Sequence, residues 1–161
     1  MKELKDFIHL YLGCECFIGS DLSTRETVQA VSKDSVCVGI NKYGVEGWYK
    51  TKSIKPILRP LSDMTKEDFI DIFKQVSLIG LSDCQFIFGK EEDEVWCNAE
   101  KEGKVIDSIS YDYNLFKMMD NDGRFHPLNP QSEAIKILLI KHLDIFGLIE
   151  AGLAIDKTTL K

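Results

Sequence analysis

The sequence predicts an α+β protein, on three observations. Short segments rich in β-branched and aromatic residues recur at regular spacing over residues 14–58. A segment with helical spacing of apolar residues follows, and β-type segments return over residues 85–119. A second segment with helical spacing, after residue 129, is the last predicted element. The expected architecture is a small curved antiparallel sheet or partial barrel, a helix, an antiparallel meander and a C-terminal helix.

The length of 161 residues predicts one domain, or at most two small ones. With 44% hydrophobic and 29% charged residues, the composition is that of a globular chain with an ordinary core. The sequence contains no repeat or low-complexity segment, and no linker separates its two halves. We therefore expect a single compact domain over residues 1–161, with a subdivision near residues 60–64.

The first element is an expected short amphipathic helix, which Gly13 is placed to end. Its apolar stripe consists of Leu4, Phe7, Ile8, Tyr11 and Leu12. Five strands are expected next, at Cys14–Ile18, Glu26–Ser32, Ser35–Ile40, Val45–Lys50 and Ile54–Leu58. Pro56 and Pro60 lack the N–H group that a sheet ladder needs, so the last of these strands is expected at an edge or at an exit from the sheet.

The clearest boundary in the chain is a helix start at Thr65. Its side chain can cap a helix whose first turn carries Glu67 and Asp68, where carboxylates favour the helix dipole. Gly80 is placed to end this helix. The apolar face is formed by Phe69, Ile72, Phe73, Val76 and Ile79. Strands are then expected at Gln85–Phe88, Glu94–Asn98, Lys104–Tyr111 and Leu115–Met119.

The final helix is marked at both ends. Asn129 can cap it, Pro130 suits its first position, and Gly147 follows the last apolar residue of the pattern. The expected apolar face is formed by Ile135, Leu138, Leu139, Ile145 and Phe146. The apolar tail over residues 148–155 is expected to dock on the body of the protein.

The charge balance argues against a protein whose whole surface attracts nucleic acid or anionic lipid. Asp and Glu total 26 against 20 Lys and Arg, a net charge of −6. No secretion signal or membrane-spanning run is recognisable, so a cytoplasmic protein without a membrane partner is expected. The odd number of cysteines then indicates reduced thiols that pack as small hydrophobic side chains. They are Cys14, Cys16, Cys37, Cys84 and Cys97.

Two segments carry a resemblance. Lys55–Thr65 leads from a strand into a helix, and Phe146–Asp156 follows the final helix. Both resemble segments of uncharacterised small proteins found on prophages and other mobile elements of gut anaerobic bacteria. The resemblance implies a bacterial or phage cytosol as the setting, and it implies no particular reaction.

No motif of an established chemistry is present. Neither glycine pattern of a phosphate-binding loop occurs, and Cys14 and Cys16 lack the paired spacing of a zinc site. We therefore predict no catalytic residue, no metal ligand and no cofactor. His126, close in sequence to Asp120 and Asp122, is the one place where an acid–base pair is readily imagined.

One basic and aromatic segment is a candidate binding surface. Five cations accompany a single carboxylate, with aromatic residues between them, as single-strand binders on small curved sheets require. The candidate residues are Lys42, Trp48, Tyr49, Lys50, Lys52, Lys55 and Arg59. On an extended strand Trp48, Lys50 and Lys52 would share a face. The alternative is that Trp48 or Tyr49 fills the sheet core while the lysines protect an exposed edge from aggregation.

The sequence favours a non-enzymatic interaction protein, of phage or mobile-element origin, whose partner is another protein. This hypothesis rests on the missing catalytic motifs, the acidic balance and the resemblance. The alternative is a nucleic-acid-binding module that uses the basic and aromatic surface over residues 42–59. A second alternative is a small enzyme with carboxylates and His126 in a cleft.

Overall fold

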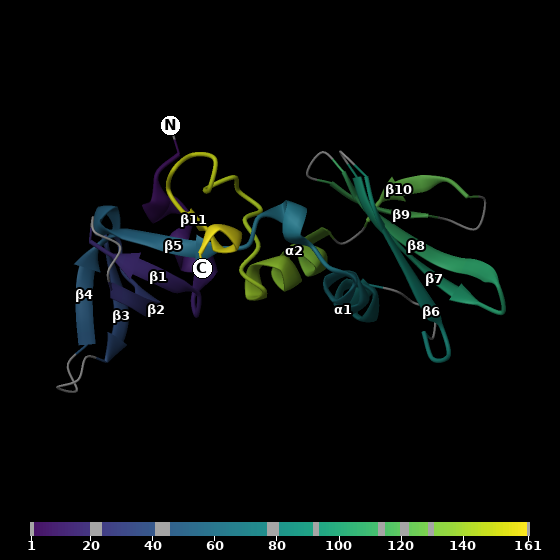
Figure 1. The fold of residues 1–161 in the computed structure, drawn as a ribbon, viewed down its shortest axis with the longest axis horizontal. Coiled ribbons are helices and arrows are strands. Elements are labelled where there is room, and N and C mark those ends of the chain that lie inside the picture. Colours follow the sequence, from purple (N-terminus) through teal and green to yellow (C-terminus); the bar gives the residue numbers. More distant parts are fainter. Residues whose placement is uncertain are drawn as a thin grey trace. The chain divides into compact units, whose positions relative to one another are not determined.

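Two sheets, in two separate units of the chain, organise the fold (Figure 1). The computed structural model describes residues 2–19, 24–40, 46–76, 81–91, 94–112, 115–119, 123–128 and 131–160. The terminal unit combines Met1–Ser62 with His142–Lys161, and the central unit is the continuous segment Asp63–Lys141. Helices and antiparallel-rich sheets together make the protein α+β, as predicted.

The terminal unit is built on an open six-stranded sheet in the order β11-β5-β1-β2-β3-β4. Its strands are β1 (Glu15–Ile18), β2 (Thr24–Val31), β3 (Ser35–Ile40), β4 (Glu46–Lys50), β5 (Ile54–Leu58) and β11 (Ile155–Asp156). All neighbours are antiparallel except β11, which runs parallel to β5. The sheet is not closed into a barrel, because β4 and β11 form its two ends.

Strand β5 lies inside this sheet, although its prolines predicted an edge or an exit. It pairs with β1 on one side, where Pro56 lies opposite Cys16, and with β11 on the other. The short β11 pairs only with Ile57 and Leu58, so it makes no demand on the missing N–H of Pro56. The partner strand comes from the far end of the chain, which no local pattern indicates.

The amino-terminal segment forms two short 3-10 helices in place of the predicted α-helix. They are η1 (Leu4–Asp6) and η2 (Ile8–Tyr11), and their buried residues are Leu4, Ile8 and Tyr11. Leu12, predicted on the same stripe, is 52% exposed. Phe7 between the two helices has a φ of −122°, and the Tyr11 hydroxyl donates to the Leu143 carbonyl at 3.2 Å. Contacts with the end of the chain thus fix a segment too short to be a stable α-helix by itself.

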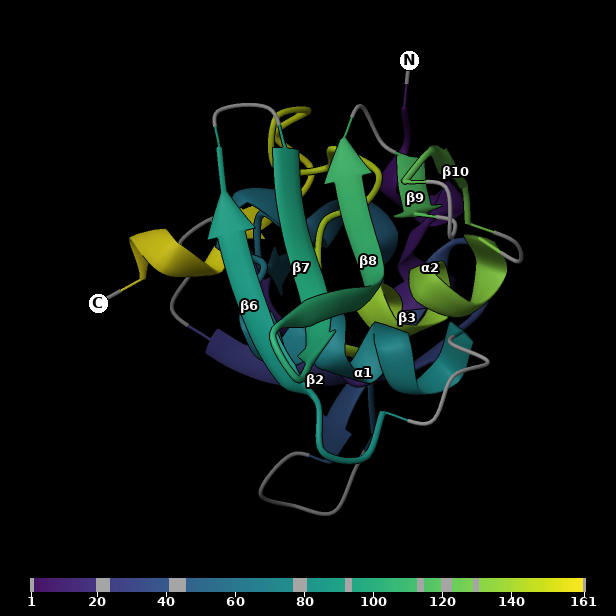
Figure 2. The same ribbon diagram turned by 90° about the vertical axis from the view of Figure 1, so that its right-hand side faces the viewer.

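The central unit carries a five-stranded antiparallel meander in the order β10-β9-β8-β7-β6, of which β6, β7 and β8 face the viewer in Figure 2. Its elements are α1 (Lys66–Val76), β6 (Gln85–Lys90), β7 (Glu94–Lys101), β8 (Lys104–Asp112), β9 (Leu115–Met119), β10 (Phe125–Pro127) and α2 (Gln131–Ile140). Strand β10 was not predicted. Glu102 and Gly103 both have positive φ values, which suit the two-residue turn between β7 and β8.

Helix α1 begins as the sequence predicts. The Asp68 N–H donates to the Thr65 hydroxyl oxygen at 3.4 Å, and the Thr65 N–H donates to the Asp68 carboxylate at 2.9 Å. The buried face of α1 packs on the sheet through aromatic rings. Phe69 lies 5.9 Å from Phe88, and Phe73 lies 5.6 Å from Phe86, between ring centroids. The predicted helix end at Gly80 and the cap at Asn129 and Pro130 lie outside the described residues.

Helix α2 ends at Ile140, seven residues before the predicted stop at Gly147. His142 has a φ of +56°, which an α-helix does not accommodate. Residues 142–160 then belong to the terminal unit. The predicted single helix is therefore wrong over its last turns, because the chain leaves the central unit there.

Arg59 holds the returning segment. Its N–H donates to the His142 carbonyl at 2.9 Å, and its carbonyl accepts from the Asp144 N–H at 2.8 Å. The buried Asp144 carboxylate accepts two further backbone N–H groups, those of Leu148 and Ile149, at 2.8 Å each. The apolar tail thus docks on the terminal unit, as predicted for the residues after 147.

Candidate binding surface on the terminal unit

The predicted basic and aromatic surface is partly assembled at the free end of the terminal sheet. Trp48 and Tyr49 lie on β4 and are 51% and 38% exposed, so neither fills the core. Lys50, the last residue of β4, is exposed, as is Lys52 in the 3-10 helix η3 (Thr51–Ser53). These four residues, here called the β4 surface, follow one another along the chain.

The other predicted residues lie elsewhere. Lys55 is on β5, opposite Phe17 of β1, and three strands separate β5 from β4 in the sheet order. Arg59 is half-buried and its backbone binds the returning carboxyl-terminal segment. Lys42 lies outside the described residues. The strand ends at Lys50, as predicted, and Lys52 lies in η3, so the face that an extended strand would give to Trp48, Lys50 and Lys52 stops at Lys50.

The register of β4 separates its two aromatic side chains. Trp48 lies opposite Cys37 and Lys50 opposite Ser35, so Trp48 and Lys50 share one face. Tyr49 lies opposite Val36, on the other face. The strand therefore presents one exposed ring on each side of the sheet.

The hydrogen-bond pattern shows which backbone groups of β4 point away from the sheet. The Thr51 N–H donates to the Asp34 carbonyl at 3.0 Å, continuing the β3–β4 register beyond Lys50. Bonded and non-bonded pairs alternate along an antiparallel ladder. The N–H and C=O groups of Trp48 and the N–H of Lys50 therefore point outward, on the side where β4 has no strand neighbour among the described residues. The C=O of Lys50 begins η3, of which Lys50 is the N-cap.

A cavity of about 420 Å³ lies at the carboxyl end of β4. Its lining combines the β4–η3 junction with η1 and with Leu153 of the carboxyl-terminal segment. Asp34 also lines it, so four stretches far apart in the chain supply its walls, and the sequence analysis missed it. No local spacing reveals such a site.

The cysteines have the buried role that the sequence predicts, with one exception. Cys14, Cys16, Cys37 and Cys97 are buried, whereas Cys84 is half-exposed. Burial raises the pKa of Cys14 to about 12 and that of Cys97 to about 11. These thiols are therefore protonated at neutral pH and poor nucleophiles. In the described part of the chain no three His, Cys, Asp or Glu side chains converge as metal ligands would.

The acid–base pair predicted at His126 lies partly outside the described residues. His126 is exposed on β10, opposite Met118, while Asp120 and Asp122 lie outside the described residues. His142 is half-buried at the start of the returning segment, and burial lowers its pKa.

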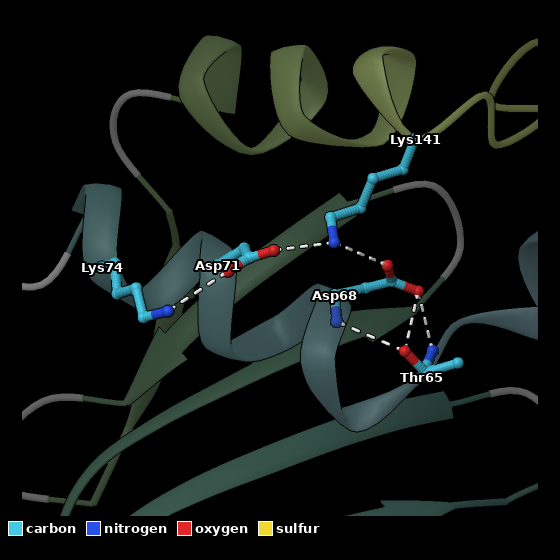
Figure 3. Close-up of polar contacts among 5 residues, drawn as sticks. All are labelled: Thr65, Asp68, Asp71, Lys74 and Lys141. Carbon is cyan, nitrogen blue, oxygen red and sulfur yellow. Dashed lines mark hydrogen bonds and ion pairs between the residues drawn. The ribbon is translucent and has the colours of Figure 1, made fainter. Parts of the chain in front are cut away.

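A charged cluster in the central unit is the other polar feature of note (Figure 3). The Lys141 ammonium lies 2.7 Å from one oxygen of Asp71 and 3.3 Å from one of Asp68, which is 2% exposed. Burial acts to lower the pKa of Lys141, but hydrogen bonds to both carboxylates outweigh it and raise the value. Thr65 occupies the other oxygen of Asp68, so the cluster ties the end of α2 to the start of α1 and serves the fold.

Neither α-helix that the structure describes has the length and apolar character needed to cross a bilayer. Comparison of the chain with protein-family models, with curated proteins and with solved structures found no match.

Proposed function

We propose that the terminal unit is a binding module that recognises a partner protein by adding an extended, acidic segment of that partner to the edge of β4. The observation that carries this proposal is the outward direction of the Trp48 N–H and C=O groups and of the Lys50 N–H at the open end of the sheet. An edge of this kind pairs with an incoming strand through main-chain hydrogen bonds.

The side chains of the β4 surface suit such a strand. Successive side chains of an added strand point to opposite faces of the sheet. Trp48 would contact those on one face and Tyr49 those on the other, and both rings are available to do so. Lys50 and Lys52 add positive charge at the carboxyl end of β4, which favours carboxylates in the partner.

The same geometry favours a peptide over a nucleic acid. Single-strand binders stack successive bases on aromatic rings that share one face. Here Trp48 and Tyr49 are on opposite faces, Lys55 is on β5, far from β4 in the sheet order, and Arg59 follows the end of β5. On the resemblance of Lys55–Thr65 and Phe146–Asp156, we further propose that the partner is encoded by a bacterial host or by the mobile element itself.

The proposal is tested by panning a random peptide library against the protein and against its Lys50→Pro variant. Lys50 has a φ of −62°, which proline adopts without strain, and its N–H points away from β3. The substitution thus removes one edge donor and leaves the β3–β4 ladder intact. We expect enrichment of acidic, β-forming peptides whose affinity for the Lys50→Pro variant is about tenfold lower than for the parent. This is the loss expected when one hydrogen bond is removed and the peptide can no longer approach β4 closely.

The matched control is Lys50→Gln, which removes the charge and keeps the N–H group. It should weaken binding less than Lys50→Pro, and the difference should persist at high salt. Equal affinity of the enriched peptides for the parent and Lys50→Pro would exclude pairing at this edge. Tight, salt-sensitive binding of labelled single-stranded DNA, without peptide enrichment, would favour the nucleic-acid alternative.

A further inference from the structure

Strand β6 ends the central sheet, and its outer edge carries little of the usual protection against pairing. It is the outermost of the three strands that face the viewer in Figure 2. Residues 85–89 include no charge and no proline, and the ladder to β7 keeps one register from Gln85 to Lys90. Charges, prolines and bulges are the features that keep a free edge from pairing. The edge of β6 is therefore suited to a further strand.

The hydrogen-bond pattern shows which backbone groups of β6 are available. The Glu91 N–H donates to the Glu94 carbonyl at 2.8 Å, so this is the bonded pair that follows Lys90 in the register. Because bonded and non-bonded pairs alternate, Phe86, Phe88 and Lys90 belong to the non-bonded pairs. Their N–H and C=O groups point outward, on the side where β6 has no strand neighbour among the described residues.

The side chains of β6 give this edge a distinctive shape on the face away from α1. Phe86 and Phe88 pack on α1, so Ile87 and Gly89 lie on the opposite face. Ile87 is 42% exposed. A Cβ atom at Gly89 would overlap the indole ring of Trp96, which lies opposite in β7 and covers the glycine. The edge thus presents an apolar projection at Ile87 and, two residues later, a position without a side chain beside an aromatic ring.

We propose that β6 pairs antiparallel with β6 of a second copy of this chain, across a twofold axis at Phe88, so that the two central sheets become one. In this register Phe88 lies opposite its own counterpart, and Phe86 lies opposite Lys90 of the partner copy. All the outward backbone groups of the strand are then paired. Ile87 lies opposite Gly89 of the partner copy, where its side chain packs against the Trp96 ring.

The symmetry of the strand favours a second copy as its partner. The projection at Ile87 and the space at Gly89 lie one residue to either side of Phe88, so a twofold axis there matches them twice. An axis at Gly89 would bring the two Trp96 rings together, and an axis at Ile87 would leave Lys90 beyond the end of the partner strand. Lys90 is the single charged residue of β6, and it lies opposite a phenylalanine, so no like charges face each other.

This inference goes beyond the recognition of a partner strand and does not rest on it, because β4 belongs to the terminal unit and β6 to the central unit. The two edges also differ in character. The β4 surface carries exposed lysines that favour an acidic partner, whereas β6 is apolar over most of its length.

The first test is sedimentation velocity of the full chain over a range of micromolar concentrations. We expect a reversible monomer–dimer equilibrium whose dissociation constant rises at least about tenfold in Ile87→Thr, because the lost apolar contact occurs twice in the dimer. Threonine is β-branched, so the strand itself is retained. The matched control is Val105→Thr, since Val105 is equally exposed at 42% but lies on β8, away from the edge. It should dimerise like the parent.

A second measurement identifies the register. In a mixture of chains with labelled isoleucine methyl groups and unlabelled chains, an isotope-filtered NOE reports only contacts between copies. We expect one between the Ile87 δ1 methyl group and the indole protons of Trp96.

The proposal would be overturned by a chain that stays monomeric at millimolar concentration, or by an equally tight dimer in Ile87→Thr. A dimer without the NOE between Ile87 and Trp96 would also overturn it, as would a dimer weakened by Lys50→Pro and unaffected by Ile87→Thr. Loss of dimerisation in Ile87→Thr together with retained peptide enrichment at β4 would support both proposals as separate sites.

Discussion

The two units differ in how their sheets are assembled and in what fills their interiors. In the central unit every strand pairs with its neighbour in sequence, from β6 to β10, and aromatic rings from α1 fill the interior. In the terminal unit β1 must find β5, and β5 must find β11 about a hundred residues further on. Its interior is instead mainly aliphatic, with Ile8, Leu58 and Leu148 fully buried around the ring of Tyr11.

Because of this difference, the two units depend on different parts of the chain in order to fold. Local pairings cost little loop-closure entropy and form early, whereas distant pairings require that entropy to be lost before they contribute. The central unit contains all the strands of its own sheet within one continuous segment. The terminal unit is complete only when residues 142–160 have returned to it, because they supply β11 and the buried Leu143 and Leu148.

The largest expected effect comes from cutting the chain after Lys141. Removal of the returning segment should unfold the terminal unit, because Arg59 and Tyr11 lose their partners and two fully buried leucines disappear. The central unit should keep its NMR spectrum, as should an isolated fragment of residues 63–141. A native terminal sheet in the shortened chain would show that the distant pairing is dispensable.

A second effect should be confined to the central unit. Lys141→Met removes an ammonium group that lies against the buried Asp68 carboxylate, and we expect a loss of about 2 kcal/mol in unfolding free energy, reduced from that of a fully buried pair because Lys141 is partly exposed. Lys74→Met is the matched control, since Lys74 and Asp71 form an exposed pair at 3.4 Å. Chemical denaturation should find the control close to the parent. Equal losses of unfolding free energy in the two variants would show that the contact between Lys141 and Asp68 contributes no more to stability than an exposed ion pair does.

As the pH is lowered, the two units should lose stability at different pH values. Burial lowers the pKa of His142, so the folded terminal unit binds this proton less readily than the unfolded chain. Its contribution is fully present above the unfolded value of 6.5 and is lost as the pH falls below it. In the central unit the hydrogen bond from Lys141 lowers the pKa of Asp71, and that contribution persists until the pH falls below the usual aspartate value of 3.8.

Hydrogen exchange between pH 7 and pH 5 should therefore show lost protection at Cys16 before Cys97, one in each sheet. Asparagine tolerates the positive φ of position 142, so His142→Asn should remove most of this pH dependence from the terminal unit. Parallel loss of protection in both units would contradict this assignment.

The smallest expected effect is a gain. Thr51→Val removes a buried hydroxyl without a described partner, so the terminal unit should become more stable by up to about 1 kcal/mol. A higher melting temperature would show that the hydroxyl is unpaired in solution as well. A clear loss of stability would indicate that its hydroxyl is satisfied in solution.

The sequence predicted those features of the candidate surface that depend on local order. Alternation and turn residues located β3 and β5 at the observed bounds, and the basic and aromatic composition singled out Trp48, Tyr49, Lys50 and Lys52. What it could not predict is that Lys55 lies on β5, far from β4 in the sheet order, and that the backbone of Arg59 binds the returning segment. Strand order depends on pairings between distant segments, and these leave no periodic signal.

By itself, then, the sequence determined the α+β class, the cap of α1 at Thr65 and most strand bounds, because each depends on neighbouring residues and their hydrogen bonds. The tertiary structure decided the end of α2, the interior position of β5 and the cavity around Thr51. In each case the deciding contact comes from the segment after Lys141 or from the amino-terminal turns. Apolar burial and backbone pairing between segments distant in the sequence override what the local pattern favours.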